Sequence, residues 1–380
     1  MRYTGVTSRG IITPIFQQGD DLVSSIVTSV KEASENEGFS LNDGDIVGVT
    51  EAVVARTQGN YATTDQIAAD VRAKLGGEDV GIVFPIMSRN RFSVVLKGIA
   101  MGCKKLYVQL SYPSDEVGNL LVDRDIFDEA GVNPYTDSYT EKEFRKLFGK
   151  DKTIHRFTGV DYIEYYKSFG DSIEIIFSND PTYILKYTGN VLNCDIHTRK
   201  RTQRLLKNAG AERSFRLDEL LTSSVMGSGY CEEYGLLGSN KATEEKVKLF
   251  PRDTQTFVDN LASALKAGTG KNIEVLIYGD GGFKDPVGGI WELADPVVSP
   301  AHTKRLVGTP NELKMKYFAD NDFASLSGEK LADAMKEQIR KKDGSLVGNM
   351  KSEGTTPRQL TDLIGSLCDL TSGSGDRGTP

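Results

Sequence analysis

Cysteine and histidine are scarce in this 380-residue chain. The cysteines are scattered and never form a CxxC pair: Cys103, Cys194, Cys231 and Cys368. Their spacing argues against a zinc site and a disulfide framework, and it suits a reducing cytoplasm. The histidines are His155, His197 and His302. None stands four residues from another, which argues against a histidine-based metal cage.

Long apolar runs and an excess of positive charge are also lacking. No run approaches the roughly 20 apolar residues that cross a bilayer. The N-terminal stretch has no continuous apolar h-region, so we expect neither a membrane partner nor a signal peptide. The formal net charge of -7 argues against general nucleic-acid binding. With 38% hydrophobic and 26% charged residues, the chain is typical of a globular protein, long enough for two cores.

Familiar catalytic signatures are missing too. The sequence has no GxSxG elbow and no flanked Cys–His signature, so nucleophilic hydrolysis has little support. The stretch "AGTGKN" at 267–272 resembles a phosphate-binding loop, but Leu265 and Asn272 break the pattern GxxxxGK[ST]. It also follows a predicted helix and precedes a predicted strand, the reverse of the order that the mechanism needs. We therefore interpret it as a helix-to-strand connection.

Helix and strand patterns alternate in the first part of the chain. Asp20 or Asp21 is positioned to cap a helix in which Leu22, Ile26 and Val30 share one face. The run "DIVGVTEAVVA" at 45–55 predicts a buried strand. A second helix is predicted over Thr64–Leu75, ended by Gly76-Gly77.

The middle segment, roughly 84–222, is more polar, and we expect an elaboration with its own small core. It holds a predicted strand at 104–112 and a predicted helix near Glu141–Phe148. In the last segment, 253–268 predicts a helix with Phe257, Leu261 and Leu265 on one face and Gly268 at its end. A strand at 272–278 follows, and "RQLTDLIGSLCDL" predicts another amphipathic helix near the end.

Two glycine-rich stretches are candidate ligand loops. In "IYGDGGFKDP" at 277–286, Asp280 comes directly after a predicted strand, where ligand sites of α/β sheets commonly lie. Asp280 or Asp285 is suited to hold Mg²⁺ beside phosphate oxygens. The alternative is a glycine turn with solvated aspartates. The second stretch, "MGSGYCEEYGLLGSNKA" at 226–242, is either a ligand loop or a plain connection.

Several basic or capping residues allow two readings each. "QQGDD" at 17–21 either directs helix amides at an anion or starts an ordinary capped helix. Arg56 follows a buried-looking run, so its partner is either a phosphate or an internal carboxylate. Two further sets either face an anion or form a solvated surface: Arg199, Lys200, Arg201, Arg204 and Lys207 in one, and Arg89, Arg91 and Lys97 in the other. From residues alone, the chain is an α/β enzyme-like protein suited to a phosphorylated ligand with Mg²⁺.

Four patches, taken in order and spacing, give the sequence a resemblance to a known family. They are "ITPIFQQGDDL", "LNDGDIVGVTEAVVARTQGN", the block from "YGLLGSN" through "KLFPRDTQTFVDNLASAL" to "NIEVLIYGDGGF", and the terminal "DLTSGSGDRGTP". Together they resemble the coenzyme F420-0:L-glutamate (γ-glutamyl) ligase family. The likeness covers roughly the first 80 and the last 150 residues, and the middle segment looks like an insertion.

The resemblance implies a fold and a reaction. The expected fold is mixed α/β, a two-domain γ-glutamyl ligase-like fold with an inserted segment. Its parts are a core portion at 1–84, the elaborated segment at 85–222, and a core portion with the nucleotide and metal site at 223–380. The family couples GTP hydrolysis to amide formation with L-glutamate, using divalent metals (Mg²⁺ or Mn²⁺) to clamp the phosphoryl group. It further implies a cytoplasmic homodimer that acts on small molecules.

The same resemblance assigns site residues by position. It implies nucleotide contacts at Thr13, Pro14, Ile15, Phe16, Glu51, Ala52, Arg56, Asn240, Ser372, Gly373, Ser374 and Gly375. The implied metal ligand is Asp280, with Asp285, Glu232 and Glu233 as helpers. Three positions depart from the family pattern: Leu237 stands at a metal-binding aspartate, Gly281 at a threonine, and Ser374 at a glutamate or glutamine.

Two functions therefore remain open at this point. The first is a nucleotide-dependent amide ligase that adds L-glutamate in γ linkage to a coenzyme F420-0-like or other phosphorylated or carboxylate acceptor. The second is a non-catalytic nucleotide- or phosphate-binding protein that keeps the scaffold without the metal site.

Overall fold

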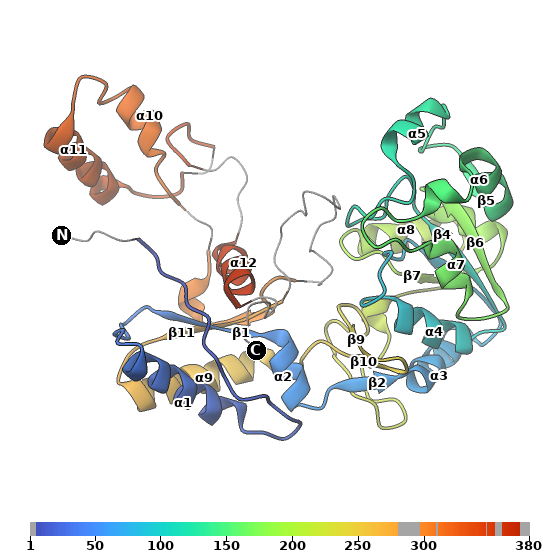
Figure 1. Cartoon of the computed structure of the whole chain (residues 1–380), viewed down its shortest axis with the longest axis horizontal. Helices are drawn as coiled ribbons and strands as arrows, with labels where there is room; N and C mark the ends of the chain where they lie inside the picture. Colours follow the sequence, from blue (N-terminus) through green and yellow to red (C-terminus); the bar gives the residue numbers. More distant parts are fainter. Residues whose placement is uncertain (1–4, 280–296, 309–310, 347, 354–358, 373–380) are drawn as a thin grey trace.

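The computed structural model describes the chain except for residues 1–4, 280–296, 309–310, 347, 354–358 and 373–380. Its described part is mixed α/β, as predicted, with two separate cores joined by a small third sheet (Figure 1). None of its helices is long and apolar enough to cross a membrane.

The first core combines the two ends of the chain. Strands β1 (Ile46–Thr50) and β11 (Glu274–Tyr278) pair in parallel, and β12 (Ala301–His302) adds to β11. Helices α1 (Leu22–Asn36) and α9 (Thr254–Thr269) pack on one face. Helix α12 (Leu360–Ser372) covers the other face, so closely that a Cβ at Gly48 would lie 2.5 Å from Cys368 Sγ (Figure 1).

Caps explain where most of the predicted helices begin and end. Asp21 accepts from the backbone N–H of Ser24 at the start of α1. Helix α3 (Thr64–Leu75) begins with a capping box and ends at Gly76, whose φ is 88°. Helix α9 is confirmed, but it runs through Gly268 and ends at Gly270.

The predicted strand at 45–55 is wrong in its second half. Strand β1 ends at Thr50, and helix α2 (Glu51–Thr57) follows at once. The Thr50 hydroxyl accepts from the Ala52 N–H and starts the helix. A short apolar run suits a buried helix as well as a buried strand, so periodicity alone does not separate them.

The middle of the chain builds the larger core. A six-stranded sheet has the order β5-β6-β4-β3-β7-β8, and all neighbours are parallel except β5 and β6. Alternate residues of its strands face helices on opposite sides, which is the arrangement of a doubly wound sheet. The expected small core is therefore wrong. The strands are β3 (Asp79–Val83), β4 (Lys105–Leu110), β5 (Ser138–Thr140), β6 (Ile173–Ser178), β7 (Asn190–Asn193) and β8 (Arg213–Arg216).

The other helices are short or peripheral. Those of the larger core are α4 (Ser93–Met101), α5 (Arg124–Glu129), α6 (Glu141–Phe148), α7 (Tyr162–Lys167) and α8 (Arg199–Asn208). Outside it lie α10 (Met315–Asp320) and α11 (Gly328–Lys341). Short 3-10 helices occur at Asp151–Thr153, Pro181–Lys186, Leu217–Glu219 and Lys304–Leu306.

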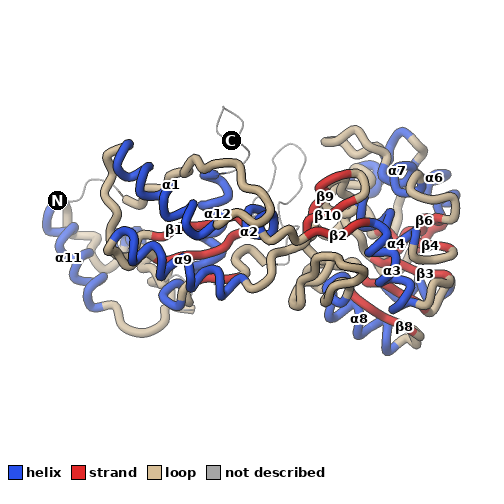
Figure 2. The backbone as a smooth tube through the Cα atoms, turned by 90° about the horizontal axis from the view of Figure 1, so that it is seen from below, coloured by secondary structure: helices blue, strands red, loops and turns tan. Residues whose placement is uncertain are grey.

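A small antiparallel sheet lies between the two cores (Figure 2). Its order is β2 (Tyr61–Thr63), β10 (Lys246–Lys248) and β9 (Asn240–Thr243). It unites a segment before residue 84 with segments after residue 222, and β3 likewise pairs with strands beyond residue 84. The boundaries 1–84, 85–222 and 223–380 remain a prediction.

Asn60 fastens the two chain segments that pass between the cores. Its side chain is fully buried, and its Nδ2 donates to the carbonyls of Tyr230 and Phe250. Its Oδ1 accepts from the Tyr230 N–H and from Arg252. Beside it, the amide of Gln58 exchanges two hydrogen bonds with the backbone of Arg252. We call this set, Gln58, Asn60 and Arg252, the crossing clamp.

Replacing Asn60 with alanine tests the crossing clamp. Asn60→Ala leaves buried carbonyl and N–H groups without partners, and we expect a loss of about 2–4 kcal/mol in unfolding free energy. Urea unfolding followed by fluorescence measures it. The control is Asn36→Ala, an exposed helix position whose amide donates to the carbonyl of Glu32, where we expect a change within about 0.5 kcal/mol. Equal midpoints for both variants would refute the clamp.

Candidate functional site

The carboxyl ends of β1 and β11 form one edge of the first core. Thr50 and Tyr278 are register partners, so the chain leaves both strands at the same edge. Glu51 follows the first strand, and Gly279 follows the second. Ligands of parallel α/β sheets bind outside this edge. Asp280, the predicted metal ligand, is next in sequence but lies outside the described residues, as does Asp285.

The end of α12 reaches this edge through Ser372. The hydroxyls of Tyr278 and Ser372 are hydrogen-bonded to each other, and Ser372 also donates to the carbonyl of Cys368. Burial raises the pKa of Tyr278, so the phenol stays neutral and keeps its proton. The predicted contact Ser372 thus lies at the end of β11. Gly373, Ser374 and Gly375 lie outside the described residues.

Arg56, in the last turn of α2, holds the end of the segment at 13–16. Its side chain is exposed, and its Nε donates to the carbonyl of Phe16 at 2.6 Å. The ring of Phe16 is buried in the first core, which fixes that end of the segment, while Ile15 is exposed. Among the described residues Arg56 forms no ion pair with a carboxylate, so the internal-carboxylate reading finds no support.

A buried ion pair lies beside Glu51. Lys248 Nζ is 2.5 and 2.6 Å from the two carboxylate oxygens of Glu51, and both side chains are buried. Lys248 is in β10, opposite Asn240 of β9. Through Lys248, the predicted nucleotide contacts Glu51 and Asn240 are brought close to each other. Sequence reasoning missed Lys248. The available signal was a lysine between Val247 and Leu249 in an apolar run, because such a residue must have a partner.

The expected metal ligands are not brought together in the described part of the chain. Glu232 and Glu233 are both exposed, and Leu237 is buried in the larger core. No group of three His, Cys, Asp or Glu residues suited to a metal occurs among the residues that the structure describes. The described residues alone therefore do not fit a metal ion, and the predicted site rests on Asp280 and Asp285.

The structure shows the local surroundings of the other stretches that allowed two interpretations. "AGTGKN" connects α9 to β11, and "QQGDD" is a capped helix start. On α8, Arg199 pairs with Asp218, whereas Lys200, Arg201, Arg204 and Lys207 are exposed. Lys97 pairs with Glu245, while Arg89 is exposed. Arg91 lines a small cavity in the larger core.

The comparison with known families decides the relationship. The family model for F420-0:gamma-glutamyl ligase matches residues 10–380. The chain belongs to this family. The match includes the middle segment, which carries the six-stranded sheet. No curated protein and no solved structure matches the chain significantly. Because this is a ligase family, membership supports an enzyme with a glutamate-ligase function.

Lys248 offers a test of the buried pair. Lys248→Met leaves the Glu51 carboxylate buried without its cation, and we expect a loss of about 3–5 kcal/mol in unfolding free energy. The double variant Glu51→Met/Lys248→Met removes both charges, and we expect it to recover most of that loss. Denaturant unfolding measures all three proteins.

The control lies in the same strand. Lys246 rests over the ring of Tyr61, and we expect Lys246→Met to cost less than about 1 kcal/mol. A double variant as unstable as Lys248→Met would contradict the ion-pair account, because the loss would then come from packing.

Proposed function

We propose that the protein is a nucleotide-dependent amide ligase that uses GTP to add L-glutamate in γ linkage to a coenzyme F420-0-like or other phosphorylated or carboxylate acceptor. One observation carries the proposal beyond family membership. Phe16, Glu51, Asn240 and Ser372 come from four distant segments. Glu51 bonds to Lys248, whose register partner is Asn240, and Ser372 bonds to Tyr278 at the end of β11. Phe16 bonds to Arg56 in α2, the helix that begins at Glu51.

The reaction sets requirements that these residues suit. A carboxylate attacks the γ-phosphorus of the nucleotide, which gives an acyl phosphate and a nucleoside diphosphate. The amine of glutamate then attacks the acyl carbon, and inorganic phosphate leaves. Both steps depend on positioning and on neutralising phosphate charge.

Charge is balanced at the proposed nucleotide site. A buried carboxylate alone would repel a triphosphate, but the ammonium of Lys248 neutralises Glu51. Arg56 is exposed beside the 13–16 segment, and among the described residues only its Nε has an acceptor, so its terminal N–H groups suit phosphate oxygens. Metal dependence (Mg²⁺ or Mn²⁺) is part of the proposal and would rest on Asp280. The homodimer also remains a proposal.

A specific observation favours the second function, a non-catalytic nucleotide- or phosphate-binding protein. Leu237 stands where the family pattern has a metal-binding aspartate, and its side chain is 1% exposed within an apolar core. It supplies no ligand. If the residues after β11 also bind no metal, the protein would bind a nucleotide without catalysing the ligase reaction.

Thermal shift with GTP and ATP, with and without Mg²⁺ or Mn²⁺, separates the two functions. A ligand that binds only the native state stabilises it, by about 2.7 kcal/mol at a concentration of a hundred times Kd. We expect metal-dependent stabilisation by GTP in the wild type and its loss in Asp280→Ala. The matched control is Asp259→Ala, an exposed position on α9.

Each result has a distinct meaning. Stabilisation by nucleotide without any metal effect favours the non-catalytic protein. No metal effect with either nucleotide contradicts the ligase. Arg56→Ala should weaken nucleotide affinity about tenfold or more, as expected for a charge-assisted hydrogen bond, and an unchanged affinity would remove Arg56 from the phosphate site.

Isotope-labelled L-glutamate tests the amino-acid substrate. We expect mass spectrometry of a small-molecule cell extract, incubated with protein, GTP and metal, to show a new species carrying the labelled glutamyl group. The species should be absent without GTP and with Asp280→Ala. A complete absence of glutamylated product in the wild type would remove glutamate from the proposal.

A further inference from the structure

The chain passes between the two cores twice. Residues 58–60 lead from α2 of the first core into β2, and residues 249–253 lead from β10 into α9 of the first core. The small sheet between the crossings packs with the larger core, because Ala62 of β2 and Val247 of β10 belong to the apolar cluster of that core. We call residues 61–248, the larger core with the small sheet, the larger body. Two short segments therefore join it to the first core (Figure 2).

No apolar cluster spans the first core and the larger body in the described part of the chain. The clusters of the larger body draw on residues 62 to 249, whereas those of the first core draw on residues before 55 and after 256. Two bodies without a large hydrophobic interface are expected to move relative to each other. Polar contacts must therefore set their arrangement.

One ion pair spans the two bodies outside the crossing segments, among the residues that the structure describes. Glu51 begins α2 in the first core, and Lys248 ends β10 in the larger body. The side chains of Lys248 and Glu51 are 10% and 5% exposed, so water screens their attraction little. This pair is therefore suited to hold the two bodies in one arrangement.

Each crossing segment contains one residue in the left-handed backbone conformation. The φ angle is 60° at Gly59 and 54° at Asp253. Gly59 directly follows the C-cap of α2, and Asp253 directly precedes α9, so both lie at the first-core end of their segments. Hinges are typically a few residues at the ends of elements that absorb changes in φ and ψ. The two residues are placed side by side in sequence logic, one on each crossing, as a hinge requires.

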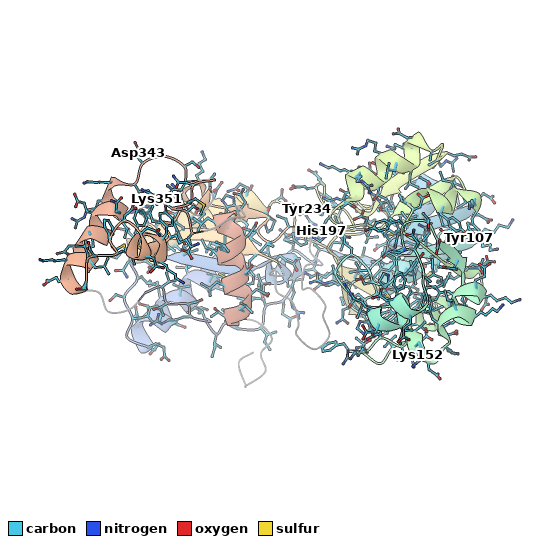
Figure 3. The ribbon with its side chains drawn as sticks, turned by 90° about the horizontal axis from the view of Figure 1, so that it is seen from above. Tyr107, Lys152, His197, Tyr234, Asp343 and Lys351 are labelled. Atoms are coloured by element: carbon cyan, nitrogen blue, oxygen red, sulfur yellow. The ribbon has the colours of Figure 1, made fainter. Side chains whose placement is uncertain are left out.

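The rest of each crossing segment is attached to the larger body. The N–H of Leu249 donates to the carbonyl of Asn60, which extends the ladder between β10 and β2. The ring of Phe250 packs edge-on against Tyr234, with ring centres 5.1 Å apart. Figure 3 shows Tyr234 near the middle of the molecule, on the side of the larger core that faces the first core. Asn60 and Phe250 therefore move with the larger body.

The hydrogen bonds that cross these positions are few. The N–H of Asn60 donates to the carbonyl of Ala55 in α2, at 3.0 Å. The side-chain amide of Gln58 bonds to the backbone of Arg252, and a side chain can follow a change of backbone angle by changing its rotamer. A rotation at Gly59 must disturb the bond from Asn60 to Ala55 but leaves the bond from Leu249 to Asn60 intact.

We propose that the molecule is hinged at Gly59 and Asp253 and that the Glu51–Lys248 pair holds the hinge in the arrangement described above. With the pair formed, the small sheet lies against the carboxyl edge of β1. Without it, the larger body rotates as one unit relative to that edge. The hinge stands or falls without the nucleotide proposal, since its test needs neither nucleotide nor metal.

Distances between spin labels, measured by double electron–electron resonance, test the role of the pair. The labels are attached through p-acetylphenylalanine at Asp259 of α9 and Lys200 of α8, two exposed positions on different bodies, which leaves the cysteines unmodified. We expect one main distance in the wild type. In Glu51→Ala/Lys248→Ala the side chains are too short to span the bodies. The share of molecules outside the wild-type distance should then rise about tenfold or more, as expected for the loss of a close charge pair.

Two controls separate rotation from unfolding. Labels at Lys142 of α6 and Lys200 both lie in the larger body, and their distance should be the same in all proteins. Lys97→Ala/Glu245→Ala removes an ion pair within the larger body, and it should leave the distance from Asp259 to Lys200 unchanged. If the alanine variant at the spanning pair does not fold, Glu51→Met/Lys248→Met replaces it with the same expectation, because it removes both charges.

Amide hydrogen exchange followed by NMR locates the hinge. In Glu51→Ala/Lys248→Ala, the N–H of Asn60 should exchange about tenfold faster or more than in the wild type, because its bond to Ala55 crosses the hinge. The N–H of Leu249, bonded within the larger body, should keep its wild-type rate.

Four results would overturn the proposal. They are an unchanged distance from position 259 to position 200 in the variant without the spanning pair, and an equal change in Lys97→Ala/Glu245→Ala. A changed distance from position 142 to position 200 would show that the larger body itself unfolds. Equal acceleration of the exchange at Asn60 and Leu249 would show that the small sheet opens instead of the hinge.

Discussion

The buried ion pair of Glu51 and Lys248 is the contact on which the candidate nucleotide site depends. Glu51 begins the helix that follows β1 in the first core, while Lys248 ends a strand of the small sheet. Two buried charges are tolerated only when they meet each other, so the pair fixes how the small sheet sits against the carboxyl edge of β1. Because β9 pairs with β10, Asn240 is placed in the same step.

The crossing clamp also holds the two cores together, but it does so mainly through hydrogen bonds of side-chain amides. Asn60, in one connecting segment, uses its amide N–H groups and its oxygen on Phe250 and Arg252 of the other connecting segment and on Tyr230 of the glycine-rich loop. The glycine-rich loop must approach this amide closely, since a Cβ at Gly229 would lie 2.4 Å from Asn60 Oδ1. That requirement explains one glycine of the loop by packing alone.

Sequence patterns predicted those elements whose signals are local. Helix α3 follows from its glycine stop and helix α9 from its apolar spacing, signals that each lie within a single short segment. The strand at 45–55 was half wrong because its apolar run carries no period. The six-stranded sheet was missed because its strands are short and its pairings join distant segments, as β3 joins β7. A pattern within one segment does not contain such pairings.

The candidate site shows the same division. Resemblance placed Glu51, Asn240 and Ser372 in one site without giving the contacts between them. Lys248, which neutralises Glu51, stayed hidden because its partner is almost two hundred residues away in sequence. The partner of Arg56, a backbone carbonyl, likewise leaves no signal in the pattern of side chains.

Leu237 belongs to the part of the glycine-rich loop that packs in the larger core. Its side chain packs with Ile86 and Ile196 at the ends of β3 and β7, where an unpaired carboxylate would be costly to bury. The loop from Leu236 to Ser239 therefore closes the larger core. Only the next residue, Asn240, enters β9 and reaches Lys248. Residues 236–239 thus line the small cavity in the larger core, and the next residue, Asn240, pairs with Lys248. A substitution that shifts Leu237 must therefore disturb the packing of the larger core and the position of Asn240.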